Sequence, residues 1–250
     1  MTRFRLPRAV LIGILAAMFA CAAASACADP LGDALNAAGK QEFSSALRVF
    51  VLMTMLSFIP VILIGMTCFT RIIVVLVLLR HALGIPQTPP NSVLITLAML
   101  LTLFSMGPVL DRVQHEAVAP YLADQITATE AITRATPSLR DFMVRQTRES
   151  DLLAISEMAR VSPPKTIGEI HFTHLAAAFL LSELRTAFQM GFVIFLPFLM
   201  IDLVVSAVLM ALGIIMLPPA TVSLPLKLLL FILIDGWVLV SRTLLGSIWS

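Results

Sequence analysis

Residues 186–212 read TAFQMGFVIFLPFLMIDLVVSAVLMAL, an apolar run whose one charged side chain is Asp202. About 20 apolar residues in a helix are enough to cross the hydrocarbon core of a membrane. Leu224–Leu245 is a second long apolar run, and the residues GIIMLPP at 213–219 come between the two. We therefore predict two long helices that pack as an antiparallel hairpin, in an all-α integral membrane protein.

The composition of the whole chain points to the same class. Of its 250 residues, 59% are apolar and 13% are charged, and the mean hydropathy is +0.97. A soluble domain has about 25% charged residues. These values exclude a disordered chain and a disulfide-rich secreted module. The net charge of +2 includes three arginines in the first eight residues, so no basic patch remains for binding nucleic acid.

The N-terminus has the order of a secretory signal peptide: basic residues, an apolar run from Ala9 to Ala20, and small residues up to Ala28. We expect residues 1–28 to be removed, with an uncleaved anchor helix as the alternative. Residues 29–45 then form a short extracytoplasmic lead. Cleavage leaves Cys68 as the only cysteine, which excludes an internal disulfide and a multi-cysteine metal site.

Charged residues are concentrated in the middle of the chain. Nine acidic and seven basic residues lie between Asp111 and Glu169, half of all the charged residues. Within this segment, Ser138 after Pro137 predicts the N-cap of a helix. After the lead we predict three parts: a first membrane-type hairpin region at 46–110, with candidate spans Ala46–Met66 and Asn91–Leu110; a charged extracytoplasmic helical domain at 111–173; and a second helical hairpin with its loop at 174–250.

Several ionisable residues lie in or beside the apolar helices, where a charge costs about 2.5–3.5 kcal/mol unless it is paired or faces a cavity. In an antiparallel hairpin that turns near Ile214, equal helical rise on both sides brings Asp202 and Lys227 to the same depth. We predict an ion pair between them, either purely structural or functional. Asp235 has no such partner within the chain, so we look for one in a neighbouring subunit. Glu183 and Arg185 lie just before the first helix of the hairpin.

The loop between these helices carries no charge, which is unusual for a short loop at a membrane surface. It admits two interpretations: an apolar seal of a pore, in which the polarizable side chain of a methionine adapts to varied surfaces, or a tight hydrophobic turn fixed by two prolines. The loop residues are Gly213, Ile214, Ile215, Met216, Leu217, Pro218 and Pro219.

No known enzyme motif is present: the chain lacks H-E-x-x-H, G-x-S-x-G and the P-loop. His171 and His174 could share a helix face, but two histidines without an acidic or cysteine ligand are weak evidence for a metal. We therefore expect no catalytic residue, no metal and no cofactor.

Several blocks of residues resemble a known family. The sequence AAFLLSELRTAFQMGF at 177–192 and the sequence PFLMIDLVVSAVLM at 197–210 resemble the two signatures of the flagellar biosynthetic protein FliP family. FTRII at 69–73, LRHALG at 79–84 and PPN at 89–91 resemble further blocks of the same family. The resemblance runs from about residue 46 to the C-terminus.

This resemblance implies a subunit of the flagellar type III secretion export gate, in the bacterial inner membrane at the flagellar basal body. In that family several copies assemble with FliQ and FliR into a helical cone around a channel, close to an FlhA-type export component. Unfolded flagellar proteins pass through it. The cleavable N-terminal signal favours the flagellar branch over the related injectisome proteins. The resemblance also implies that apolar hairpins can be buried in protein above the bilayer.

The resemblance also implies roles for particular residues. The loop at 213–219 corresponds to an apolar gasket, although Ile214 and Ile215 stand where the family often has methionine. Glu183, Asp202 and Lys227 correspond to residues of the same charge, which implies subunit contacts and pairing within the hairpin. A different class of function stays open from the residues alone, an ion-coupled small-solute transporter that uses Asp202 and Asp235.

Overall fold

The computed structural model describes residues 50, 53–54, 57, 64–162, 166, 169–214 and 216–249. Within these residues every regular element is helical, in agreement with the all-α class expected from the composition. The predicted signal peptide (1–28), the lead (29–45) and most of the predicted span Ala46–Met66 lie outside the described residues.

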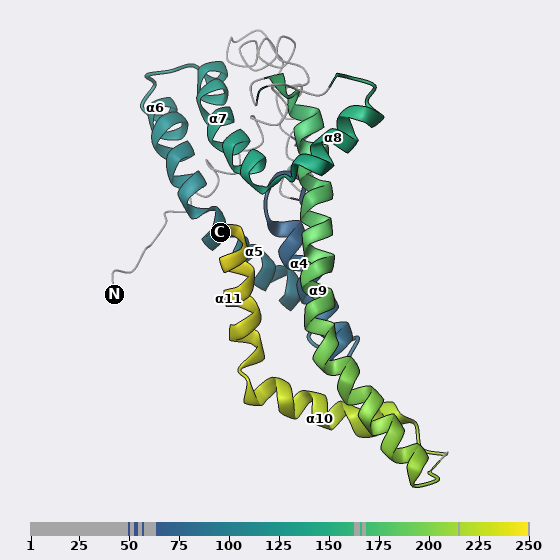
Figure 1. Ribbon diagram of the computed structural model, residues 1–250. Coiled ribbons are helices and arrows are strands. Elements are labelled where there is room, and N and C mark those ends of the chain that lie inside the picture. Colours follow the sequence, from purple (N-terminus) through teal and green to yellow (C-terminus); the bar gives the residue numbers. More distant parts are fainter. Residues whose placement is uncertain are drawn as a thin grey trace. The chain divides into compact units, whose positions relative to one another are not determined.

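Figure 1 shows the order of the helices along the chain. They are α4 (Phe69–Ala82), α5 (Asn91–Val113), the π-helix η1 (Gln114–Val118), α6 (Ala119–Leu122), α7 (Ala128–Gln146), α8 (Glu149–Met158), α9 (Phe172–Ala211), α10 (Pro219–Leu233) and α11 (Gly236–Trp249).

The chain forms two compact units. Unit one contains Met106–Ser182 and the chain up to Thr67, and unit two contains Cys68–Ser105 and Glu183–Ser250. Helices α5 and α9 each contribute residues to both. The part Met106–Ser182 overlaps the charged segment predicted at 111–173, whose status as a separate domain outside the membrane stays a prediction.

In unit one, α7 begins earlier than the sequence analysis predicts. Its N-cap is Thr127, whose hydroxyl accepts the backbone N–H of Glu130 at 3.3 Å. Pro137 lies inside the helix, so the predicted start at Ser138 is wrong. The pattern Thr-x-x-Glu at 127–130 is the signature of a helix N-terminus. It outweighs the proline, because a single proline bends a helix without always ending it.

Two contacts fasten the charged helices of unit one to the start of α9. The rings of Phe142 and Phe179 meet edge to face with their centroids 5.9 Å apart. The hydroxyl of Ser182, which is fully buried, donates to Asp151 Oδ2 at 2.7 Å and accepts the backbone N–H of Arg148 at 3.0 Å. The second contact fixes the N-terminus of α8, because the Ser182 hydroxyl gives both Asp151 and the Arg148 N–H a hydrogen-bond partner.

Unit two is built around α4. Ile72, Val75, Leu76 and Leu79 follow the 3–4–7 spacing of one helix face, and all four are fully buried. Gly191 lets α9 approach this helix closely, because a Cβ atom at that position would lie 2.2 Å from Leu78 Cδ1. The apolar face of α4 therefore forms the core against which the hairpin packs.

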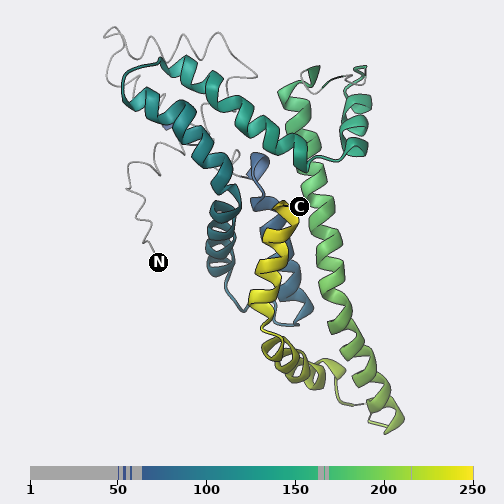
Figure 2. The same ribbon diagram turned by 60° about the vertical axis from the view of Figure 1, so that its left-hand side comes forward.

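The second predicted helix of the hairpin, Leu224–Leu245, is not continuous. It is divided into α10 and α11, which meet at a bend of 63°, and both views show this bend (Figures 1 and 2). At the break, Asp235 has a φ of +49°, a left-handed conformation that Asp tolerates better than most residues. At Gly236 a Cβ atom would lie 2.1 Å from the ring of Phe231. The pair Asp-Gly therefore ends one helix and starts the next.

Two helical segments are long and apolar enough to cross a membrane, Asn91–Leu122 and Phe172–Ala211. The bent pair α10–α11 makes a third if it counts as one span. The first segment begins at the predicted Asn91 and continues twelve residues beyond the predicted Leu110. These counts refer to the described residues alone.

We expect Gly236→Ala to destabilise unit two by about 1–3 kcal/mol, because the added methyl group overlaps the Phe231 ring in a packed core. Thermal unfolding of the detergent-solubilised protein measures this loss. The control is Gly246→Ala, since a Cβ atom there meets nothing within 4 Å. Equal losses of stability in the two variants would show that the break does not depend on this close contact.

Candidate functional site

Lys227 joins three helices of unit two. Its Nζ donates to Asp202 Oδ2 at 2.6 Å, which links α10 to α9. The same nitrogen donates to the backbone carbonyl of Ala82 at 3.3 Å, in the last turn of α4. Lys227 is buried, whereas about a third of the Asp202 side chain is exposed. The ammonium group also lies at the negative end of α4, where a cation stabilises the helix dipole.

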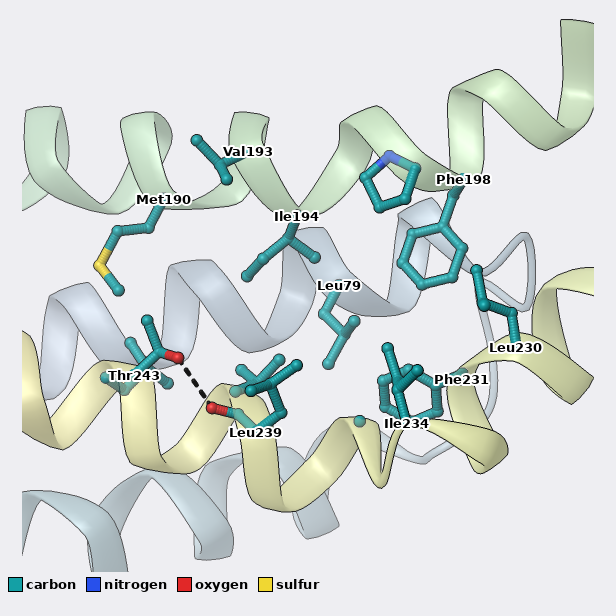
Figure 3. Close-up of a pocket in the computed structure, with 14 residues that line it drawn as sticks. Leu79, Met190, Val193, Ile194, Phe198, Leu230, Phe231, Ile234, Leu239 and Thr243 are labelled. Carbon is teal, nitrogen blue, oxygen red and sulfur yellow. Dashed lines mark hydrogen bonds between the residues drawn. The ribbon is translucent and has the colours of Figure 1, made fainter.

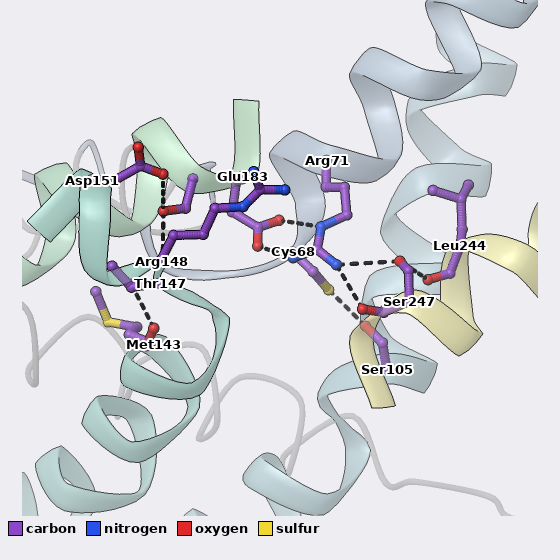
Figure 4. Close-up of polar contacts among 11 residues, drawn as sticks. Cys68, Arg71, Ser105, Met143, Thr147, Arg148, Asp151, Glu183, Leu244 and Ser247 are labelled. Atoms are coloured by element: carbon purple, nitrogen blue, oxygen red, sulfur yellow. Dashed lines mark hydrogen bonds and ion pairs between the residues drawn. The ribbon is translucent and has the colours of Figure 1, made fainter. Parts of the chain in front are cut away.

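A second ion pair joins α4 to α9 and α11 (Figure 4). Arg71 Nε donates to Glu183 Oε2 at 2.9 Å, and Arg71 Nη2 donates to Glu183 Oε1. Arg71 Nη1 donates to the backbone carbonyl of Ser247 at 3.0 Å and contacts its hydroxyl at 3.2 Å. Both members of the pair are buried. This planar two-point contact is the strongest form of an arginine–carboxylate pair.

Glu183 is among the site residues predicted from the sequence, but its pairing with Arg71 is not. One signal was available, because Arg71 is the lone charge inside an apolar segment and needs a partner there. Glu183 and Arg185 both lie within α9, which begins at Phe172, so their predicted place just before the helix is wrong. Arg185 is exposed. Asp235 is exposed at the break between α10 and α11, and within the described residues its carboxylate has no ion pair.

Beside the arginine, Cys68 and Ser105 share a buried hydrogen bond that links the start of α4 to α5 (Figure 4). The indole N–H of Trp249 donates to the Ser105 carbonyl at 3.3 Å. Cys68 lies outside both candidate spans. Burial is the largest cause of a raised pKa of its thiol, from 9.0 to about 11. The hydrogen bond to Ser105 and the charge of Arg71 lower this pKa, whereas the Glu183 carboxylate raises it further. The thiol is therefore neutral and packed.

The loop between α9 and α10 presents apolar side chains outward. Gly213 has a φ of +69°, which glycine adopts freely. Pro218 has an extended backbone as the N-cap of α10, and Pro219 is the first residue of the helix. The side chain of Met216 is 96% exposed, and Ile214 and Leu217 are also exposed. Ile215 lies outside the described residues. The turn is thus fixed by glycine and proline, while the methionine at its tip is almost fully exposed.

The two histidines noted in the sequence lie at the start of α9. The rings of His171 and His174 are 5.6 Å apart, edge to face. Across the described ranges, no group of three or more His, Cys, Asp or Glu side chains has a geometry that could hold a metal ion.

Comparisons with known proteins identify one family. The model described as the FliP family matches residues 52–244. "Flagellar biosynthetic protein FliP" of Pectobacterium carotovorum subsp. carotovorum is 50% identical over 212 residues, which are 85% of this chain and 82% of that protein. The protein of the same name from Bacillus subtilis is 45% identical, covering 83% of this chain and 94% of its own length. The one from Caulobacter vibrioides is 42% identical, covering 97% and 91%.

We expect Lys227→Glu to destabilise the protein by up to about 3 kcal/mol, because two carboxylates then face each other where one is buried. Adding Asp202→Lys restores part of the stability. The restoration is incomplete, since a glutamate at position 227 cannot donate to the Ala82 carbonyl. Thermal unfolding in detergent measures both variants. If the double variant is no more stable than Lys227→Glu, the pair does not stabilise the hairpin.

The buried thiol of Cys68 leads to two expectations, one for stability in alkaline solution and one for labelling at pH 7–9. Its thiol has a higher pKa in the folded state than in the unfolded chain, so the unfolded chain loses this proton first. The contribution of Cys68 to stability is therefore complete below pH 9 and is lost as the pH rises toward 11. In a chain with Cys21 and Cys27 replaced by alanine, we expect maleimide to label Cys68 slowly at pH 7–9 and rapidly after unfolding in detergent at the same pH. Fast labelling of the folded protein would show an accessible thiolate.

Proposed function

Because this chain belongs to the FliP family and is thereby a component of the flagellar export apparatus, we propose that it forms part of the wall of a protein-export channel. Unfolded flagellar proteins pass through this channel, which several copies build together with FliQ and FliR. The role is structural and requires no cofactor and no catalytic residue. An FlhA-type export component lies nearby, and the assembly belongs to the inner membrane at the flagellar basal body.

The observation that carries this proposal is the tip of the hairpin. An exposed methionine stands among apolar residues at the end of two helices that Asp202 and Lys227 hold together. Such a tip offers no charge and no strong hydrogen-bond donor to a passing polypeptide. A ring of these tips therefore supports a seal that closes around varied sequences without binding any of them, since methionine adapts its shape readily.

The length of α9 supports an assembly rather than a lone chain in lipid. Its 40 residues extend about 60 Å at 1.5 Å per residue, whereas the hydrocarbon core is about 30 Å thick. Large apolar side chains are exposed along it from Phe188 to Met210. Contact with other subunits covers the portion that lipid does not reach. In the same assembly, we assign Asp235 and Arg185 to contacts between subunits and residues 111–173 to the extracytoplasmic side.

The alternative function, an ion-coupled transporter of small solutes, finds no support in the comparisons. Of the two carboxylates that this function would use, Asp202 is already engaged, because Lys227 Nζ lies 2.6 Å from its Oδ2. A carboxylate engaged by a lysine is a poor site for reversible binding of a transported ion. We therefore do not retain this function.

We expect a photo-crosslinking amino acid at position 216 to capture a flagellar export substrate that is stalled in transit. The residue is fully exposed at the hairpin tip, so a substitution there leaves the ion pairs intact. The same crosslinker at Met158, which is 71% exposed on α8 of unit one, is the control.

The readout is an immunoblot for the stalled substrate after irradiation of cells. Capture at position 216 with none at position 158 supports a channel lined by the loop. No capture at position 216, in cells that still assemble filaments, would contradict this role for the loop.

A further inference from the structure

Unit two contains an apolar groove between α9 and the α10–α11 pair. Its volume is about 290 Å³, larger than the cavities of about 150 Å³ that hold a benzene ring. Figure 3 shows Met190, Ile194 and Phe198 of α9 on one side and Leu239 and Thr243 of α11 on the other. Leu79 of α4 also contributes to the lining.

The chemistry of this groove restricts what can fill it. Thr243 is the one polar side chain in its lining, and its hydroxyl donates to the Leu239 carbonyl of its own helix at 2.9 Å. No group is left for a polar or charged ligand. The groove opens at the surface, because Val193, Ile234 and Leu239 in its lining are 46–64% exposed. The groove therefore suits an apolar occupant that enters from outside.

The opposite side of the same helix carries a ridge of exposed apolar side chains. Phe188, Phe192 and Leu196 are spaced four residues apart, the spacing of a ridge on a helix surface. Leu199 and Leu203 extend this face. Phe192 and Ile194 are two positions apart, so their side chains point about 200° apart around the helix. Helix α9 thus has a concave apolar surface on one side and a convex one on the other.

We propose that the α9 ridge of one copy, centred on Phe192, seats in the groove between α9 and α11 of a second copy. The ridge residues and the groove lining are uncharged, and the exposed Arg185 lies one turn before Phe188 at the end of the ridge. An aromatic ridge fits a groove of this size. The two surfaces lie on opposite sides of α9, so a single partner cannot engage both of them. The contact is therefore heterologous and repeats from copy to copy around a ring. A symmetric contact would instead set groove against groove and leave both unfilled. This inference rests on the proposed assembly of several copies and names the surfaces that join them.

The proposal is tested by disulfide formation between copies. Phe192→Cys on the ridge and Leu239→Cys at the groove are combined in a chain whose Cys21 and Cys27 are replaced by alanine. The buried Cys68 is retained. The control combines Phe192→Cys with Ile232→Cys, since Ile232 is 71% exposed on α10 and does not line the groove. Membranes containing FliQ and FliR are treated with a mild oxidant and analysed on a non-reducing gel.

We expect a ladder of dimers, trimers and larger species from the first pair and none from the control, because a heterologous contact links copies in series. Equal ladders from both pairs, or a dimer alone, would overturn the proposal. So would absence of a ladder while the complex keeps its mass and the cells still swim, and this result would leave the export function standing. If the protein is a monomer in the intact assembly, the proposed function itself fails.

A groove-filling variant provides a second measurement. Thr243→Phe places an aromatic ring in the groove, and we expect it to cause loss of the multimer in mass measurements of the purified complex. Adding Phe192→Ala to the same chain makes room again and restores part of the multimer. If Thr243→Phe instead removes a bound lipid and leaves the multimer unchanged, the groove holds an acyl chain and the proposal is wrong.

Discussion

Charged groups inside an apolar helical unit must be paired, and this requirement determines which helices are neighbours in unit two. Apolar packing has no direction and lets helices slide past one another with little change in buried area. Arg71 contacts α9 and α11 from α4, and Lys227 contacts α9 and α4 from α10. Each cation therefore connects three helices. A shift of one turn in any of them would leave a buried charge without its partner, which is costly.

The sequence is sufficient to predict features that depend on residues close together in the chain. The all-helical class and the approximate place of the hairpin turn come from apolar run lengths and from the residues at 213–219. The equal-rise argument sets Asp202 opposite Lys227, and these atoms lie 2.6 Å apart in the structure. Because a short loop joins the two helices, the sequence itself fixes their relative depth.

The sequence is insufficient to predict contacts between distant segments and the exact places where helices begin or break. Arg71 and Glu183 are 112 positions apart, and nothing in the sequence sets the depth of α4 against that of α9. The run of apolar residues continues on both sides of Asp235, so run length does not reveal the break there. The charge of Asp235 predicts a partner, and its backbone conformation adds a second role in a turn. At α7, Pro137 predicts a helix start, whereas the helix begins at the Thr-x-x-Glu pattern ten residues earlier.

The bond from Lys227 to Ala82 has a mechanical consequence for the hairpin tip. Because one ammonium group holds α9, α10 and the end of α4 together, the tip is not a flap that swings by itself. Moving α10 away from α9 also pulls on α4, whose other end is held by Arg71. A displacement of the tip that separates α10 from α9 would therefore also displace the end of α4, the same helix that carries the Arg71–Glu183 pair.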